Sequence, residues 1–177
     1  MSACKTGAEH IKTLKDGRTV YIDGKLVIHH GREYQVMTNS PIYSQQLALD
    51  AYWKQIGGTT MLPGTNRASD RFVRAAFYIN AIPQTDKIEE AVASAFSVIR
   101  NVSVPFGAPN RAPGSLYNTE YRTAMDLTNQ TYYFEFTTAP NVIWTQLLHF
   151  DLGKGSPVLL LDPDNVELVG DVTKDFK

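Results

Sequence analysis

The sequence predicts an α+β protein in which amphipathic helices cover antiparallel β-sheets. β-rich runs fill the beginning and the end of the 177-residue chain, and helical patterns lie between them. Turn dipeptides such as Asp23-Gly24 join neighbouring strands directly, as antiparallel pairing requires. With 43% hydrophobic and 20% charged residues, the chain has the composition of one globular domain that can bury a core.

The N-terminal part is expected to form a short helix and then three antiparallel strands. The helix is predicted over 6–15. Asp23-Gly24 lies between the β-rich runs 19–22 and 25–29 and predicts a hairpin. Residues 33–38 predict a third strand beside it.

Three helices are predicted in the middle of the chain. Ser44 is the expected N-cap of the first, the second covers about 68–80, and Asp86 with Glu89 forms a capping-box pair at the third. The predicted apolar faces are Leu47, Ala48, Ala51, Tyr52 and Ile56 in the first helix, Phe72, Ala75, Ala76 and Ile79 in the second, and Ile88, Ala91, Val92, Ala95, Phe96, Ile99 and Val102 in the third.

A second antiparallel set is predicted near the C-terminus. Three runs rich in aromatic and β-branched residues, 119–125, 131–137 and 143–150, are separated by turn signals. A last short strand is expected at 158–161, and the polar residues 162–177 are expected to fray.

Charge and composition argue against several partners. The formal charge of −1 and the pI near 6.4 provide no basic stripe for nucleic acid and no polybasic patch for anionic lipid. No apolar run approaches 18 residues, and the N-terminus lacks the core of a signal peptide, so we expect no membrane partner and a cytoplasmic location as the chain is written. Cys4 is the single cysteine, and His29 and His30 are adjacent in a strand and point to opposite faces, so no metal or cofactor is expected.

Two polar side chains stand where regular structure changes into helix. Asn39 lies in the elbow 36–41, and Arg71 lies in the segment 62–74. From residue type alone, Asn39 is an ordinary turn residue that bonds its own backbone, and Arg71 is a solvated surface charge.

Read together, TNSPIYSQQLALDAYW and LPGTNRASDRFVRAAFYINAIP resemble the C-terminal half of the choloylglycine hydrolase family. These N-terminal-nucleophile amidases include penicillin V acylases and conjugated bile acid hydrolases. The resemblance covers 21–161 and implies a four-layer αββα sandwich, of which this chain represents about half. Residues 1–20 form an atypical leader that resembles the start of flavin-dependent 4-hydroxyphenylacetate hydroxylases, and 162–177 form a polar tail.

The long loop 106–116 is equally consistent with a lid and with a surface excursion.

The resemblance also implies a chemistry for the two polar side chains. In the family, an N-terminal cysteine attacks a linear amide, an asparagine helps hold the oxyanion, and an arginine lies beside the thiol. Asn39 falls on the oxyanion asparagine and Arg71 on that arginine. Cys4, the only available thiol, follows Met-Ser-Ala, so its α-amino group becomes free only after cleavage.

Two hypotheses follow from the resemblance. In the first, the chain is a truncated or fused part of an amidase that acts on a small N-acyl amide, such as penicillin V or a conjugated bile acid. In the second, it is a non-catalytic chain that needs a complementary half. Under both, we expect the aromatic side chains of Tyr132, Phe134 and Phe136 to be exposed on an uncovered sheet face and to favour self-association.

Overall fold

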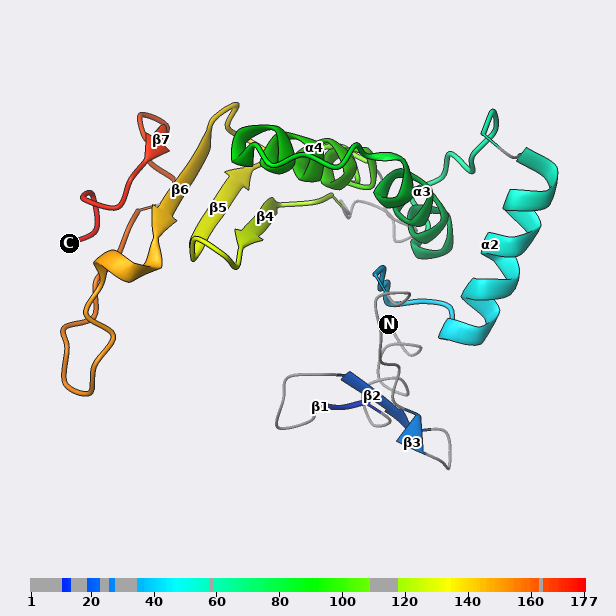
Figure 1. The fold of residues 1–177 in the computed structure, drawn as a ribbon, viewed down its shortest axis with the longest axis horizontal. Helices are drawn as coiled ribbons and strands as arrows, with labels where there is room; N and C mark the ends of the chain where they lie inside the picture. The colour runs from blue at the N-terminus through cyan, green and yellow to red at the C-terminus, as the bar shows by residue number, and fades with distance from the viewer. Residues whose placement is uncertain are drawn as a thin grey trace. The chain divides into compact units, whose positions relative to one another are not determined.

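The chain forms two compact units, Met1–Met37 and Thr38–Lys177 (Figure 1). A computed structural model describes the backbone alone for residues 11–13, 19–22 and 26–27, and backbone with side chains for 35–57, 59–108, 118–162 and 164–177. Each helix of the described residues is too short or too polar to span a lipid bilayer.

The first unit contains a three-stranded antiparallel sheet in the order β1-β2-β3. Its strands are β1 (Ile11–Thr13), β2 (Thr19–Ile22) and β3 (Leu26–Val27). Pairing of Ile22 with Leu26 confirms the predicted hairpin. The helix predicted over 6–15 is wrong at 11–13, because these residues gain ladder hydrogen bonds by pairing with β2.

The strand predicted at 33–38 is also wrong over 35–38, the part of it that the structure describes. Residues 35–38 have no strand partner, whereas 28–34, which include His29 and His30, lie outside the described residues. Most of the loop 106–116 lies outside them as well, so the structure does not test whether this loop is a lid or a surface excursion.

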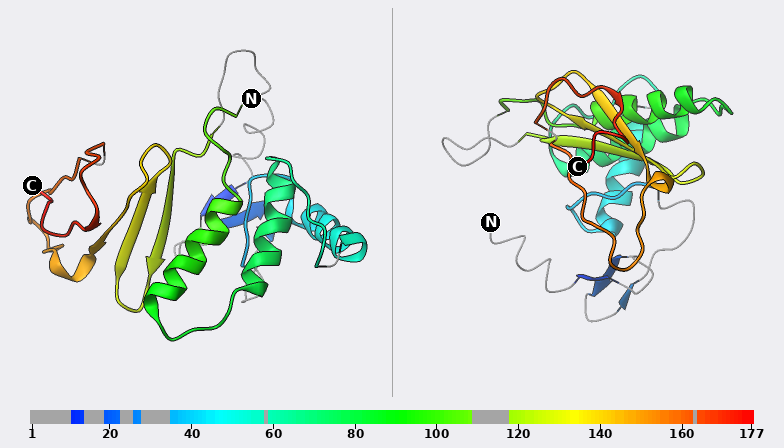
Figure 2. Two further views of the ribbon diagram at one scale, coloured as in Figure 1. Left: turned by 90° about the horizontal axis from the view of Figure 1, so that it is seen from above. Right: turned by 90° about the vertical axis from the view of Figure 1, so that its left-hand side faces the viewer.

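The second unit contains three helices followed by a four-stranded sheet. The helices are α2 (Tyr43–Gly57), α3 (Ala68–Ala81) and α4 (Ile88–Asn101). The strands are β4 (Tyr121–Asp126), β5 (Thr131–Phe136), β6 (Val142–Gln146) and β7 (Gly170–Asp171), with a 3-10 turn at Leu147–His149. Contacts run from α2 to α3, from α3 to α4, and from α4 to β4, so α4 joins the helices to the sheet (Figures 1 and 2).

The C-terminal residues do not fray as predicted. β7 pairs in parallel with β6, Val172 is 2% exposed, and its N–H donates to the Trp144 carbonyl at 2.9 Å. The strand predicted at 158–161 does not form; instead the Leu160 and Lys177 backbones exchange two hydrogen bonds of 2.7 and 3.0 Å. Burial of an apolar side chain therefore anchors a segment whose average composition is polar.

The two faces of the sheet differ in what covers them. The pleat places Arg122 and Glu135, which are cross-strand partners, on the face that meets α4. Tyr132, Phe134 and Phe136 lie on the opposite face and are half-buried, not fully exposed as predicted. The rings of Tyr121 and Phe134 stack with their centroids 5.5 Å apart, and Asn165, Val166 and Leu168 help to line a small cavity over this face. Self-association through it stays a prediction.

The helices confirm one predicted face and correct another. In α3, Phe72 and Ala75 are buried as expected. In α2 the predicted apolar face is wrong: Leu47 and Tyr52 are 45% and 54% exposed, while the polar residues Gln46 and Asp50 are buried. The reason is geometric, because α2 packs on α3 through the turn that carries Gln46, whose side chain hydrogen-bonds to α3.

The predicted capping box of α4 is also absent. Lys87 occupies the N-cap position without a side-chain cap. Thr85 replaces the expected pair: its hydroxyl accepts a hydrogen bond from the Lys87 N–H at 3.2 Å and donates one to Glu90 at 2.9 Å. One threonine thus joins both ends of the first turn, which Asp86 and Glu89 were expected to do.

Candidate functional site

Asn39 lies in a bend immediately before α2. The bend continues through a cis Ser40-Pro41 bond, and the first helical hydrogen bond, from the Gln46 N–H to the Ile42 carbonyl, closes at 3.0 Å. The Asn39 side chain is exposed and makes no hydrogen bond within the described residues. It does not serve as the backbone-bonding turn residue that its type alone suggests, and its amide donor is available to a ligand.

The loop that leads into α3 is held in place by Arg74. This arginine is 9% exposed, and its Nη1 donates to the carbonyls of Pro63 and Thr65 at 2.7 and 2.9 Å. The Asp70 carboxylate accepts from the Thr65 backbone N–H at 3.2 Å and from the Thr65 hydroxyl. Burial lowers the pKa of Arg74, Asp70 opposes that shift, and the positive charge of Arg71 adds to it. Arg74 is therefore a structural arginine.

Arg71 differs sharply from Arg74 although both lie in α3. Its backbone N–H donates to the Arg67 carbonyl at 3.0 Å, which places it in the first turn of the helix. Its side chain is half-buried, its Nε is fully buried, and no hydrogen bond within the described residues engages its guanidinium. Arg71 is therefore not the fully solvated surface charge that its type suggests, and its charge remains available to an anion.

The structure adds Gln46, a residue that sequence reasoning missed. Gln46 is 1% exposed, and its Nε2 donates to the Ser69 carbonyl at 3.0 Å. This bond joins α2, which begins just after Asn39, to the first turn of α3, which carries Arg71. Glutamine is a common residue in helices, so the sequence held no signal for this role.

Asn39 and Arg71 thus lie at the starts of two helices that contact each other. Both are among the described residues, and no hydrogen bond joins them directly. That they face one reacting centre stays a prediction. Cys4 lies outside the described residues.

The chemistry available to the pair is stabilisation of negative charge. An amide N–H can donate to an oxyanion, and a guanidinium stays protonated at any physiological pH. Neither group is a nucleophile or a base at neutral pH. Bond cleavage at this site therefore needs a nucleophile from another part of the protein.

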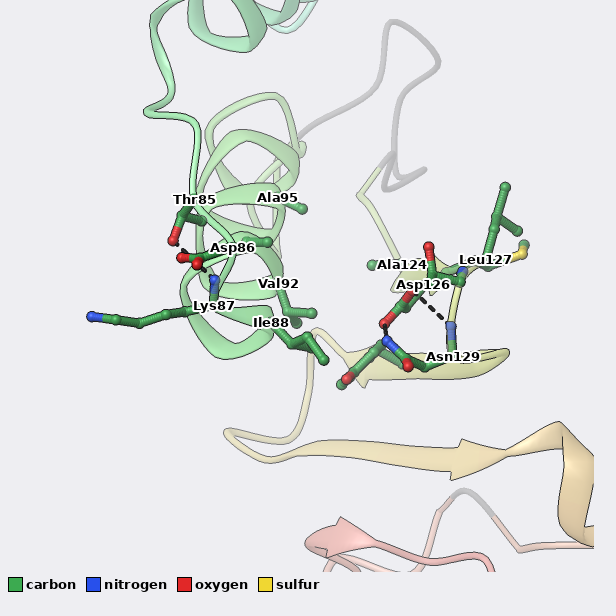
Figure 3. A pocket seen from close by; sticks show the side chains of 14 residues that line it. Thr85, Asp86, Lys87, Ile88, Val92, Ala95, Ala124, Asp126, Leu127 and Asn129 are labelled. Carbon is green, nitrogen blue, oxygen red and sulfur yellow. Dashed lines mark hydrogen bonds between the residues drawn. The ribbon is translucent and has the colours of Figure 1, made fainter.

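A cavity of about 510 Å³ lies elsewhere in the second unit, between the start of α4 and the β4–β5 turn (Figure 3). Ile88 and Val92 form part of its apolar wall. Two of its three charged groups are engaged: Lys87 contacts Glu90 at 2.7 Å, and hydrogen bonds from the Asn129 side chain and backbone lower the pKa of Asp126. Asn39 and Arg71 are not among its lining residues, so the cavity is separate from the candidate site.

Comparisons with known proteins agree on one family. Residues 15–169 match the family described as linear amide C–N hydrolases, choloylglycine hydrolase family. Penicillin V acylase from Pectobacterium atrosepticum is 50% identical over 139 residues, which are 72% of this chain and 37% of that protein.

Solved structures confirm the predicted α+β fold class. The structure of penicillin V acylase from Agrobacterium tumefaciens shares 50% identity at a TM-score of 0.78, covering 92% of this chain and 53% of that one. A mutant of conjugated bile acid hydrolase from Clostridium perfringens matches at 22% identity and a TM-score of 0.57, covering 77% and 48%, and shows the fold alone. The chain thus spans about half or less of the length of these relatives.

Proposed function

Because the chain belongs to the choloylglycine hydrolase family of linear amide C–N hydrolases, we propose that it takes part in the hydrolysis of a small N-acyl amide. Penicillin V is the substrate to test first, since two relatives at 50% identity are penicillin V acylases. The observation that carries the proposal is the pair of side chains without hydrogen bonds among the described residues, Asn39 and Arg71, at the starts of two helices joined by Gln46.

In this proposal, Asn39 stabilises the oxyanion. When a nucleophile adds to the amide carbon, the carbonyl oxygen gains a negative charge that the substrate does not carry. A side-chain amide already aimed at that oxygen lowers the barrier, because its interaction strengthens only in the transition state. Loss of one such donor lowers kcat by about 10²–10³.

Arg71 supports the nucleophile. The family resemblance implies an N-terminal cysteine, and a thiol is reactive as its thiolate. A permanent positive charge beside the sulfur lowers the pKa of the thiol. The α-amino group accepts the thiol proton and passes it to the leaving nitrogen, after which water cleaves the thioester and restores the thiol. Cys4 is the single cysteine of the chain and is therefore the thiol to test in this role, once cleavage has freed its α-amino group.

The test combines intact-mass measurement with an assay of penicillin V hydrolysis by the full chain, in which the product amine is quantified. Mass shows whether Cys4 is terminal. We expect Asn39→Ala to lower kcat/KM by about 10²-fold or more, and Cys4→Ala to abolish turnover. Asn66→Ala is the matched control, because Asn66 is an exposed asparagine in the loop before α3.

Three results would overturn the proposal. One is an Asn39→Ala effect no larger than that of Asn66→Ala. Another is turnover that survives Cys4→Ala. The third is a protein with a terminal Cys4 that hydrolyses neither penicillin V nor a glycine-conjugated bile acid, which would favour a non-catalytic chain.

A further inference from the structure

We propose that Gln46 is a positioning residue for Arg71: its side-chain amide fixes the first turn of α3 and thereby the direction of the Arg71 guanidinium. That the orientation of Arg71 affects hydrolysis rests on the proposed function. That Gln46 sets this orientation rests only on the contacts between α2 and α3.

The first argument is burial. Gln46 is 1% exposed, although its helix leaves Leu47 and Leu49 at 45% and 38% exposed. Burying an amide among apolar groups costs free energy unless its hydrogen bonds are made. Because this helix buries a glutamine and exposes leucines, the burial of Gln46 is explained by its hydrogen bond and not by hydrophobicity.

The second argument is the partner of that hydrogen bond. Gln46 Nε2 reaches the carbonyl of Ser69, 23 residues away, at 3.0 Å. Ser69 belongs to the same helical turn as Arg71, and in an α-helix each residue is rotated by about 100° from the last. Fixing the carbonyl of Ser69 against α2 therefore also fixes the direction in which the Arg71 side chain leaves the helix.

The third argument is that no hydrogen bond of its own holds Arg71. Within the described residues, Arg71 Nε and Gln46 Oε1 are buried polar atoms without a hydrogen-bond partner. Such atoms are rare in native structures and call for an explanation. The orientation of Arg71 must come from its helical turn and its packing, and Gln46 is the side chain that ties this turn to α2.

The experiment compares Gln46→Met with Gln45→Met in the full chain. Methionine has nearly the length of glutamine but forms no comparable hydrogen bond, and Gln45 is the exposed neighbour on the same helix. The first readout is the Nε–H signal of Arg71 in proton–nitrogen NMR spectra, assigned by its loss in Arg71→Lys. The Arg74 signal serves as the internal reference.

We expect Gln46→Met to shift the Arg71 Nε–H signal and to speed its exchange with solvent by roughly tenfold, as loss of one buried hydrogen bond predicts. Gln45→Met should leave the signal unchanged. If Gln46→Met does not fold, Gln46→Glu, which keeps the length and one acceptor, takes its place. An Arg71 signal that stays at its wild-type position and exchange rate in the folded Gln46 variant overturns the inference.

The second readout is kinetic. At a temperature where both proteins are fully folded, Gln46→Met should lower kcat for penicillin V by roughly tenfold while KM changes little, because Arg71 acts on the nucleophile and not on the binding of the substrate. Failure of the proposed function and failure of the positioning role give different results. If the Arg71 signal shifts but no protein hydrolyses the substrate, wild type included, the proposed function is refuted and the positioning role is not. Hydrolysis with an unmoved signal refutes the positioning role.

Discussion

Replacing Glu135 with glutamine tests the junction between α4 and the sheet. The Glu135 side chain is 6% exposed and meets two arginines, Arg100 from α4 at 2.6 Å and Arg122 from β4 at 2.9 Å. Arg122 Nε also donates to the Ser103 hydroxyl at 2.8 Å. Glu135 thus supplies the negative charge for two cations that come from different elements.

The expected cost follows from how buried each arginine is. Arg100 is 48% exposed and regains water when its partner is lost, but Arg122 is 16% exposed and is left as an uncompensated buried charge. Removing one partner of a buried pair costs about 3–5 kcal/mol, and the water available to Arg100 favours the lower end, about 3 kcal/mol. With a urea slope of about 2 kcal/mol/M, the unfolding midpoint should fall by about 1.5 M.

Urea titration followed by tryptophan fluorescence measures this change, because Trp144 packs against Tyr133, two residues before Glu135 in β5, with ring centroids 5.8 Å apart. Glu90→Gln is the matched control, since Glu90 forms an exposed ion pair with Lys87 on the same helix. We expect the control to leave the midpoint unchanged. A Glu135→Gln shift no larger than that of Glu90→Gln would refute the reasoning.

The same pair predicts a pH dependence. Burial alone raises the pKa of Glu135, but the hydrogen bonds and positive charges of Arg100 and Arg122 outweigh it and hold the pKa below the ordinary value of 4.5. A carboxyl whose pKa is lower in the folded state stabilises the protein above its unfolded pKa, and this stabilisation fades as pH falls through the folded pKa. The difference between wild type and Glu135→Gln should be full above pH 4.5 and should shrink below it.

Four further predictions concern other parts of the chain. Arg74→Met should leave the Pro63 and Thr65 carbonyls unpaired and make residues 62–67 more sensitive to proteolysis; unchanged cleavage would contradict the role given to Arg74. Phe96→Ala, at a position 2% exposed, should lower the free energy of unfolding by about 3–5 kcal/mol in a denaturant titration. The side chains of Asn39 and Arg71 should lie within about 15 Å of each other and face the same side in a crystal of the protein, because one reacting centre must reach both; opposite faces would refute the site. Light scattering at high concentration should show self-association that Met125→Lys weakens, because Met125 is 65% exposed on the aromatic sheet face; a monomer at all concentrations would refute it.

The elements that sequence periodicity predicted well are those with local causes. Helix α3 begins at Ala68 as expected, because its apolar stripe repeats at helical spacing and its loop is rich in turn residues. Strands β4 and β5 lie within two residues of their predicted bounds, since aromatic and β-branched runs end at polar turns. In both cases the residues that decide the element are its own near neighbours in the chain.

The candidate site also has some residues that local sequence identifies and one contact that depends on tertiary packing. Asn39 and Arg71 were identified from two sequence segments and the family that they resemble. The bond from Gln46 to Ser69 spans 23 residues, and nothing in either segment marks it. Its existence depends on how α2 packs against α3, and residue type alone does not set that packing.

By itself, therefore, the sequence determined the fold class, the family and the two residues expected to stabilise charge. The tertiary structure alone decided which side of α2 is buried, that β7 pairs in parallel with β6, and that Glu135 joins Arg100 to Arg122. Each of these depends on partners far apart in the chain: Glu135 lies 35 residues after Arg100, and β7 begins more than 20 residues after β6 ends. Hydrophobic periodicity shows that a segment has a face to bury, but the neighbour that buries it is chosen when the whole chain folds.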